Sequence, residues 1–151
     1  MDVLERIAQR SVFIDTAPFI YLIERHPRYH PIIRPLFESL AAGSFAGATS
    51  VITLLEVLVQ PLRQGRADLA REYRSILTES SGLRLVPVTA EVAEMAAELR
   101  ARYSIRVADA IQAAAGIRQD CAVFITNDVR LTCLAEFSDV IVLADLASPQ
   151  T

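Results

Sequence analysis

The chain has 151 residues, which is enough for one domain with a sizeable core and too few for two. Hydrophobic residues make up 52% of it and charged residues 22%, a balance that excludes a disordered chain. The formal net charge of −3 argues against nucleic-acid binding by a broadly basic surface. All 15 basic residues are arginines, which excludes a phosphate-binding loop that needs a lysine.

The chain also lacks the marks of a membrane or disulfide-bonded protein. No apolar run is long enough to span a bilayer, and the segment MDVLERIAQR has no apolar stretch of signal-peptide type. Cys121 and Cys133 are the only cysteines, and their spacing fits neither a disulfide framework nor a thiolate metal site. We therefore expect a cytoplasmic protein with reduced cysteines and no membrane partner.

The first informative stretch is VFIDTAPFIYLIE at residues 12–24. Its apolar start predicts a buried strand over residues 11–15, and Thr16 and Pro18 indicate that a helix follows at once. Asp15 then lies at the carboxyl end of a parallel strand, where open α/β sheets bind their ligands. Asp is also common as an ordinary turn residue, so this stretch alone leaves both interpretations open.

Two histidines follow in the segment HPRYHP. His26 and His30 are four residues apart, a spacing that can place two metal ligands on one face of a helix. Pro27 and Pro31 interrupt such a helix and favour a solvated loop. Helical spacing resumes over residues 32–42, where an apolar stripe repeats every three or four positions.

The second informative stretch is the apolar segment that follows a predicted strand over residues 45–49. It predicts a helix over residues 51–60 that Pro61 ends. Glu56 is the only charge in this helix and its helical neighbours are apolar, so we expect both the helix and the carboxylate to be buried. A buried carboxylate needs a cation or a basic partner, and a Glu that pairs with arginine or reaches solvent is the alternative.

Residues 63–79 predict a charged amphipathic helix with an apolar inner side. Such a face is usually only solvated, but in an acidic protein it is the best local candidate for contacts with RNA phosphates. The residues proposed for these contacts are Arg63, Arg66, Arg71 and Arg74.

The second half of the chain continues with a strand over residues 83–87 and a structural helix over residues 90–103. The next helix, over residues 104–117, carries Asp109 in its first turns, either as a ligand or as a partner of the helix dipole. Its alanines allow a close approach of backbone and ligand.

A further apolar strand over residues 121–126 runs directly into polar residues that begin a short helix. Asp128 therefore also lies at the carboxyl end of a strand. A last strand is predicted over residues 140–143. Strands that alternate with helices predict an α/β fold: a single domain over residues 1–151, with a parallel sheet of about five strands between helices.

Four acids, Asp15, Glu56, Asp109 and Asp128, come from strand ends and apolar helices that meet at one rim of this sheet. Ionised carboxylates repel each other unless a hard cation binds them, and Mg²⁺ or Mn²⁺ prefers oxygen ligands. The four carboxylates therefore predict a metal site. Such a site is suited to activating water for hydrolysis of a phosphodiester.

The motifs VFIDTAPFIYL, SVITLLEVLV, RVADAIQAAA and FITND resemble the four acidic motifs of PIN-domain proteins, most closely the VapC-like toxins of toxin–antitoxin pairs. The resemblance extends over essentially the whole chain, in order and spacing. It implies a Mg²⁺-dependent endoribonuclease, usually a homodimer, that a small antitoxin protein inhibits. It also implies that the four acids are metal ligands, supported by Thr16, Thr126 and Asn127.

The sequence departs from the family at two points and leaves one alternative. Ala17 stands where relatives often have Asn or Ser, and LTC follows the last motif in place of an Asp-Phe pair. Response-regulator receivers and haloacid-dehalogenase-like phosphatases resemble the site but require a lysine, which this chain lacks. The remaining alternative is a non-catalytic PIN-like module for RNA binding or assembly, which the four intact acids disfavour.

Overall fold

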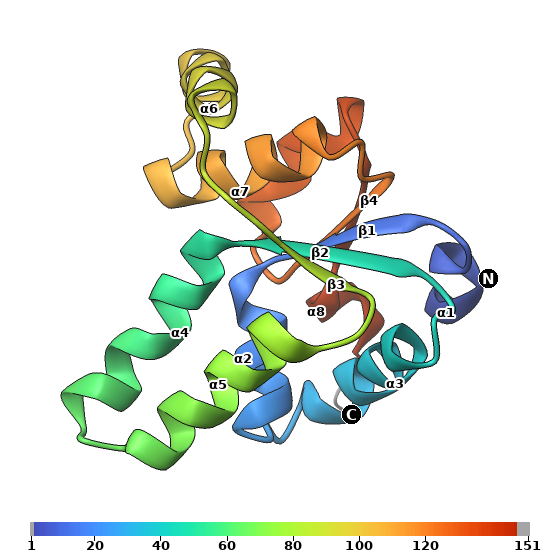
Figure 1. Cartoon of the computed structure of the whole chain (residues 1–151). Coiled ribbons are helices and arrows are strands. Elements are labelled where there is room, and N and C mark those ends of the chain that lie inside the picture. The colour runs from blue at the N-terminus through green and yellow to red at the C-terminus, as the bar shows by residue number, and fades with distance from the viewer. Residues whose placement is uncertain (1, 148–151) are drawn as a thin grey trace.

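A computed structural model describes residues 2–147 and confirms the α/β fold (Figure 1). Five parallel strands form one sheet in the order β3-β2-β1-β4-β5. Each strand begins and ends within two residues of its predicted limits. The strands are β1 (Ser11–Ile14), β2 (Ala46–Ser50), β3 (Leu83–Val86), β4 (Val123–Thr126) and β5 (Asp139–Val142).

Strand β1 lies at the centre of the sheet because its apolar residues are covered on both faces. Phe13 pairs with Ala48 of β2 on one side and with Phe124 of β4 on the other, and the two phenyl rings stack with centroids 5.2 Å apart. The chain passes from β1 to β2 in one direction, whereas β4 lies on the opposite side of β1. The carboxyl ends of β1 and β4 therefore flank the point where strand order reverses, which is where such sheets bind ligands.

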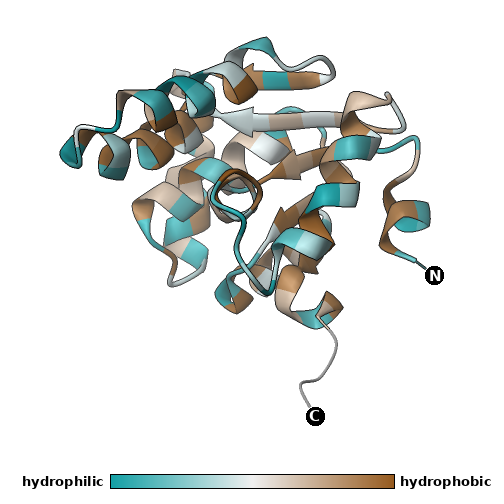
Figure 2. Cartoon of the chain, turned by 90° about the horizontal axis from the view of Figure 1, so that it is seen from below, coloured by the Kyte–Doolittle hydropathy of each residue, from teal (hydrophilic) through white to brown (hydrophobic). Residues whose placement is uncertain are grey.

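Helices cover both faces of the sheet and make a three-layer sandwich (Figure 1). Val12 and Ile14 face the larger core, which includes side chains from α1 (Val3–Ile7), α2 (Thr16–Ile23), α3 (His30–Ala41), α4 (Val51–Arg63), α5 (Ala67–Glu79) and α8 (Leu143–Leu146). Phe13 faces the other core, under α6 (Ala90–Arg102), α7 (Val107–Arg118) and the 3₁₀ helix η1 (Val129–Glu136). Figure 2 shows hydrophobic and hydrophilic residues alternating along the surrounding helices.

Helix α7 packs directly on β1, because its buried face consists of small residues. A Cβ atom on Gly116 would lie only 3.1 Å from Cγ of Phe13, so a larger residue there would push the helix away. The end of α7 is tied to the start of β1, where Ser11 Oγ donates a 3.0 Å hydrogen bond to the carbonyl of Asp120. The start of α7, with Asp109, consequently lies beside the carboxyl end of β1.

Two expectations about the helices are wrong. The predicted helix over residues 63–79 is two elements, since α4 continues through Pro61 to Arg63 and a turn with Gly65 at φ +66° separates it from α5. Helix α4 is also not buried all round. Its buried positions Thr53, Val57 and Pro61 recur every four residues, which leaves the opposite side at the surface, including Leu55 and Leu62 at 59% exposure each. The short helices α1 and α8 lie outside the predicted set.

Among residues 2–147 no helix is both long enough and apolar enough to cross a membrane.

Candidate functional site

Asp15 occupies the junction between β1 and α2, as predicted. It caps α2, and its Oδ1 accepts a 2.9 Å hydrogen bond from the backbone N–H of Thr16. Its Oδ2 accepts a 2.8 Å bond from the hydroxyl of Thr126 at the end of β4. Only 9% of the residue is exposed, so this carboxylate is held in one orientation by buried donors.

Asp109 and Asp128 lie near each other at the same edge of the sheet. Asp109 is in the first turn of α7, and its Oδ2 accepts a 3.0 Å bond from Nε of Arg106. Asp128 caps η1, and Nη2 of Arg130 donates a 2.6 Å bond to its Oδ2. Nη2 of Arg106 is 3.9 Å from the same oxygen, so one guanidinium bridges the two acids.

Glu56 reaches the site from α4, but it is exposed and not buried as expected. Its Oε1 accepts a 2.7 Å hydrogen bond from the hydroxyl of Thr16, so the carboxylate has a polar partner and needs no buried cation. The sequence argument failed because α4 turns only one of its apolar sides to the core. The conclusion that Glu56 belongs with the other acids nevertheless agrees with its position.

The four acids line one open pocket of about 220 Å³. Thr16, Thr126 and Asn127 line it as well, so the supporting residues also lie where the sequence analysis placed them. Asn127 donates a 3.0 Å bond from Nδ2 to the hydroxyl of Tyr21, and its Oδ1 accepts a 2.9 Å bond from the backbone N–H of Ala144. Asn127 thus ties the end of β4 to α2 and α8.

The pKa values of Asp15 and Asp128 are shifted in opposite directions. Burial raises the pKa of Asp15, and the nearby charges of Asp109 and Glu56 raise it further, against the hydrogen bonds from Thr16 and Thr126. The pKa of Asp128 is lowered, chiefly by its side-chain hydrogen bond from Arg130. Asp15 therefore resists ionisation, whereas Arg130 favours the ionised form of Asp128.

The donor set has the chemistry of a site for a hard cation, because every carboxylate supplies oxygen atoms. As the side chains stand, no three His, Cys, Asp or Glu residues within residues 2–147 are gathered closely enough to hold a metal ion. Arg106 and Arg130 engage oxygens of Asp109 and Asp128 that a metal would need. Those ion pairs must open before these two carboxylates can coordinate a cation.

Sequence reasoning missed a polar cluster directly under the pocket. Gln112 is 1% exposed, and Ser50 and Thr53 are fully buried beside it. The available signal was the position of Gln112, which is the one polar side chain in the segment AIQAAAGI and lies one helical turn after Asp109. Hydrogen bonds from this cluster reach Asp15 and Thr16.

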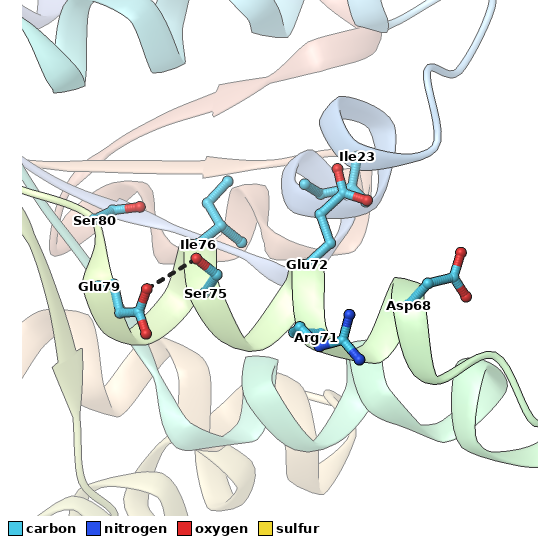
Figure 3. A pocket seen from close by; sticks show the side chains of 8 residues that line it. All are labelled: Ile23, Asp68, Arg71, Glu72, Ser75, Ile76, Glu79 and Ser80. Atoms are coloured by element: carbon cyan, nitrogen blue, oxygen red, sulfur yellow. Dashed lines mark hydrogen bonds between the residues drawn. The ribbon is translucent and has the colours of Figure 1, made fainter.

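The arginines proposed to contact RNA lie on α4, on the following turn and on α5, outside the pocket that holds the four acids. Arg71 borders a separate hollow of about 590 Å³ between α5 and Ile23 of α2, together with Asp68, Glu72 and Glu79 (Figure 3). Nη2 of Arg66 lies 3.5 Å from Oδ2 of Asp68. The basic residues of this region are thus interleaved with acids, and RNA contact there stays a prediction.

The two histidines do not share one helix. His30 is the first residue of α3, whereas His26 precedes it in the connecting segment. Nδ1 of His26 accepts hydrogen bonds from the backbone N–H groups of Arg28 and Tyr29, at 3.1 and 3.2 Å. The expected break in the helix is confirmed at Pro27, but Pro31 lies in the first turn of α3, so His30 is not part of a loop. The role of His26 here is to order the turn.

The chain matches the PIN domain family over residues 12–136, and it belongs to that family. The fold is similar to that of VapC20 from Mycobacterium tuberculosis, a sarcin-ricin loop cleaving toxin, with a TM-score of 0.70 and 23% identity over 85% of this chain and 98% of that one. The fold is also similar to that of VapBC2 from Rickettsia felis bound to a promoter DNA fragment, with a TM-score of 0.67 and 19% identity over 87% of this chain and 98% of that one. A toxin–antitoxin complex from Klebsiella pneumoniae has a similar fold, with a TM-score of 0.64 and 23% identity over 87% of this chain and 97% of that one. No curated protein matches the sequence.

Proposed function

We propose that this protein is a metal-dependent endoribonuclease that uses Mg²⁺ or Mn²⁺ and acts as the toxin of a toxin–antitoxin pair. The observation that carries the proposal is the pocket at the carboxyl ends of β1 and β4, where Asp15, Glu56, Asp109 and Asp128 converge. Membership of the PIN domain family supports a nuclease, and the similarity in fold to toxins such as VapC20 supports the more specific role.

The four carboxylates would hold the cation, which when bound supplies the charge that polarises a phosphodiester and activates water. Thr16 and Thr126 orient Asp15 through their hydrogen bonds to its two oxygens. The Thr16 hydroxyl keeps its proton directed at Oε1 of Glu56. Arg106, whose side chain is 68% exposed, is the cationic group of the pocket lining and can attract a phosphate anion.

Two protein partners form part of the proposal: a second copy of the chain and an antitoxin. The apolar side chains of α2 and α3 offer little surface to a partner, because they pack inside the protein; Phe19, Ile33, Leu36 and Leu40 belong to the core. Leu55 and Leu62 are two exposed apolar side chains on one helix, α4, and can present apolar surface to a partner. The acidic pocket would in turn accept an arginine from an antitoxin, because a guanidinium pairs well with carboxylates.

Cleavage of RNA by purified protein tests the enzymatic part of the proposal. We expect cleavage of a structured RNA with Mg²⁺ or Mn²⁺, none after chelation with EDTA, and none in Asp15→Asn. Asp120→Asn is the matched control, because it removes the same charge at a surface position whose φ of +55° suits Asn. Cation binding without cleavage by the wild-type protein would point instead to a binding module.

Expression in a bacterial host tests the toxin assignment separately. We expect the wild-type chain to arrest growth and Asp15→Asn to be harmless. Coexpression with the product of the gene immediately upstream should restore growth and yield a complex that copurifies. Normal growth with abundant, folded wild-type protein would contradict the toxin assignment even if RNA cleavage is found in vitro.

A further inference from the structure

Gln112 lies directly beneath the acidic pocket, on the buried side of α7. It follows Asp109 by three residues, so both side chains project from the same side of the helix. Its 1% exposure leaves no contact with solvent, and every polar atom of its side chain is used within the protein. A long amide in a segment of alanines must therefore have a structural or functional reason to be there.

The orientation of the amide is determined by its neighbours. Oε1 accepts a hydrogen bond from the hydroxyl of Ser50. The oxygen of that hydroxyl accepts from the backbone N–H of Ile52, so its proton is available to donate to Gln112. Nε2 donates to Thr53 Oγ1 at 2.7 Å and to Asp15 Oδ1 at 3.3 Å. Ser50 therefore faces the oxygen of the amide, and the NH₂ group faces Asp15 and Thr53.

The same amide also reaches Glu56 through one intermediate. Nε2 is 3.3 Å from Thr16 Oγ1, and the Thr16 hydroxyl donates to Glu56 Oε1 at 2.7 Å. One buried group thus contacts Asp15 directly and Glu56 through Thr16. These two acids come from different elements, β1–α2 and α4, and the amide connects their side chains across that gap.

We infer that Gln112 is a positioning residue for the metal-binding carboxylates, holding Asp15 and, through Thr16, Glu56 in the orientation that receives the cation. This inference rests on the proposed function. Hydrogen-bond partners outside the ligand set orient metal ligands, and their loss typically weakens metal affinity by about 10- to 100-fold. A residue that only fills the core would affect stability and leave the metal affinity of the folded protein unchanged.

Calorimetric titration with Mn²⁺ of wild type, Gln112→Met and Gln119→Met separates these roles. Met has a similar length but no donor, so in Gln112→Met we expect Mn²⁺ affinity to fall by about 10-fold or more and kcat for RNA cleavage to fall with KM little changed. Gln119→Met is the control, since Gln119 caps the other end of α7 and its Oε1 bonds to Arg84 at 2.7 Å. Its Mn²⁺ affinity should equal that of the wild type.

A second variant, Thr53→Val, keeps the test decisive if Gln112→Met does not fold. It removes a hydroxyl that accepts from the amide and lies 3.2 Å from Thr16 Oγ1, without removing a group bonded to Asp15, so Mn²⁺ affinity should again fall. Wild-type affinity in a folded Gln112→Met protein, or in Thr53→Val if only that variant folds, would overturn the inference. If the wild-type chain itself binds no Mn²⁺, the proposed function fails first and the inference fails with it.

Discussion

The hydroxyl of Thr16 donates a 2.7 Å hydrogen bond to Oε1 of Glu56 and so joins the start of α2 to the middle of α4. This bond explains how an exposed glutamate on an outward-facing part of a helix still contributes to a defined site. The side chain of Glu56 is thus oriented by a residue of α2 that lines the pocket, and not by its own helix. On the proposed function, Glu56 would contribute to binding a cation and not to folding.

We therefore expect Glu56→Gln to weaken Mn²⁺ binding strongly while the free energy of unfolding changes by no more than about 0.5 kcal/mol. The amide keeps the hydrogen bond from Thr16 but loses the charge that attracts the cation. Titration calorimetry and chemical denaturation measure the two effects. Glu98→Gln, on the exposed side of α6, should change neither quantity. Unchanged Mn²⁺ affinity in Glu56→Gln would remove this residue from the site.

Replacement of Asp109 by Asn should reduce RNA cleavage by about 100-fold or more, because it removes a charge that would act directly on the cation. The fold should be retained, and stability can rise, since the change removes one of the charges that repel Asp15. Cleavage rate and thermal midpoint should be measured on the same preparation. Near wild-type cleavage would exclude Asp109 from the mechanism.

The two acids at strand ends could be predicted because β1 and β4 each carry a continuous apolar run that stops at polar residues. VFID and VFITND place Asp15 and Asp128 at the same edge once the strands are taken as parallel. The strand order follows less directly. The sequence shows that strands alternate with helices, but the pairing of β1 with both β2 and β4 depends on how the helices distribute between the two faces.

The environment of Glu56 could not be predicted, because an apolar sequence does not reveal which side of a helix is covered. Leu55 and Leu62 would have indicated burial by composition alone, yet both are at the surface. The same limit applies to Arg106 and Arg130, whose contacts with Asp109 and Asp128 depend on side-chain geometry and not on spacing. The amide of Gln112 was recognisable only as an isolated polar residue among alanines.

Arg6, Arg10 and Asp139 form an ion-pair cluster at the amino end of β5, away from the pocket, and it allows a prediction about stability. Asp139, in β5, accepts hydrogen bonds from Arg6 and Arg10, and the contact with Arg6 is the main cause of its lowered pKa. Asp139→Asn should reduce stability near pH 7 by about 1 kcal/mol, a modest value because both arginines are more than one third exposed. RNA cleavage should be unaffected.

The pH dependence of that loss has a definite sign. A carboxyl with a lowered pKa in the folded protein contributes stability above its ordinary pKa of 3.8, and the contribution disappears as pH falls through the lowered value. Denaturation curves of Asp139→Asn and wild type should therefore converge in acid and separate at neutral pH. A difference that is the same at all pH values would show that packing, and not charge, is responsible.

Asp15 should show the opposite dependence, because burial raises its pKa above the ordinary value of 3.8. Between 3.8 and the raised value the folded protein binds more protons than the unfolded chain, so this group lowers stability progressively as pH increases. Asp15→Asn cannot ionise and escapes that loss. With EDTA present, the thermal midpoint of Asp15→Asn should rise relative to wild type as pH increases from about 4 to 7. A midpoint difference that shrinks over this range would mean that the hydrogen bonds from Thr16 and Thr126 outweigh burial.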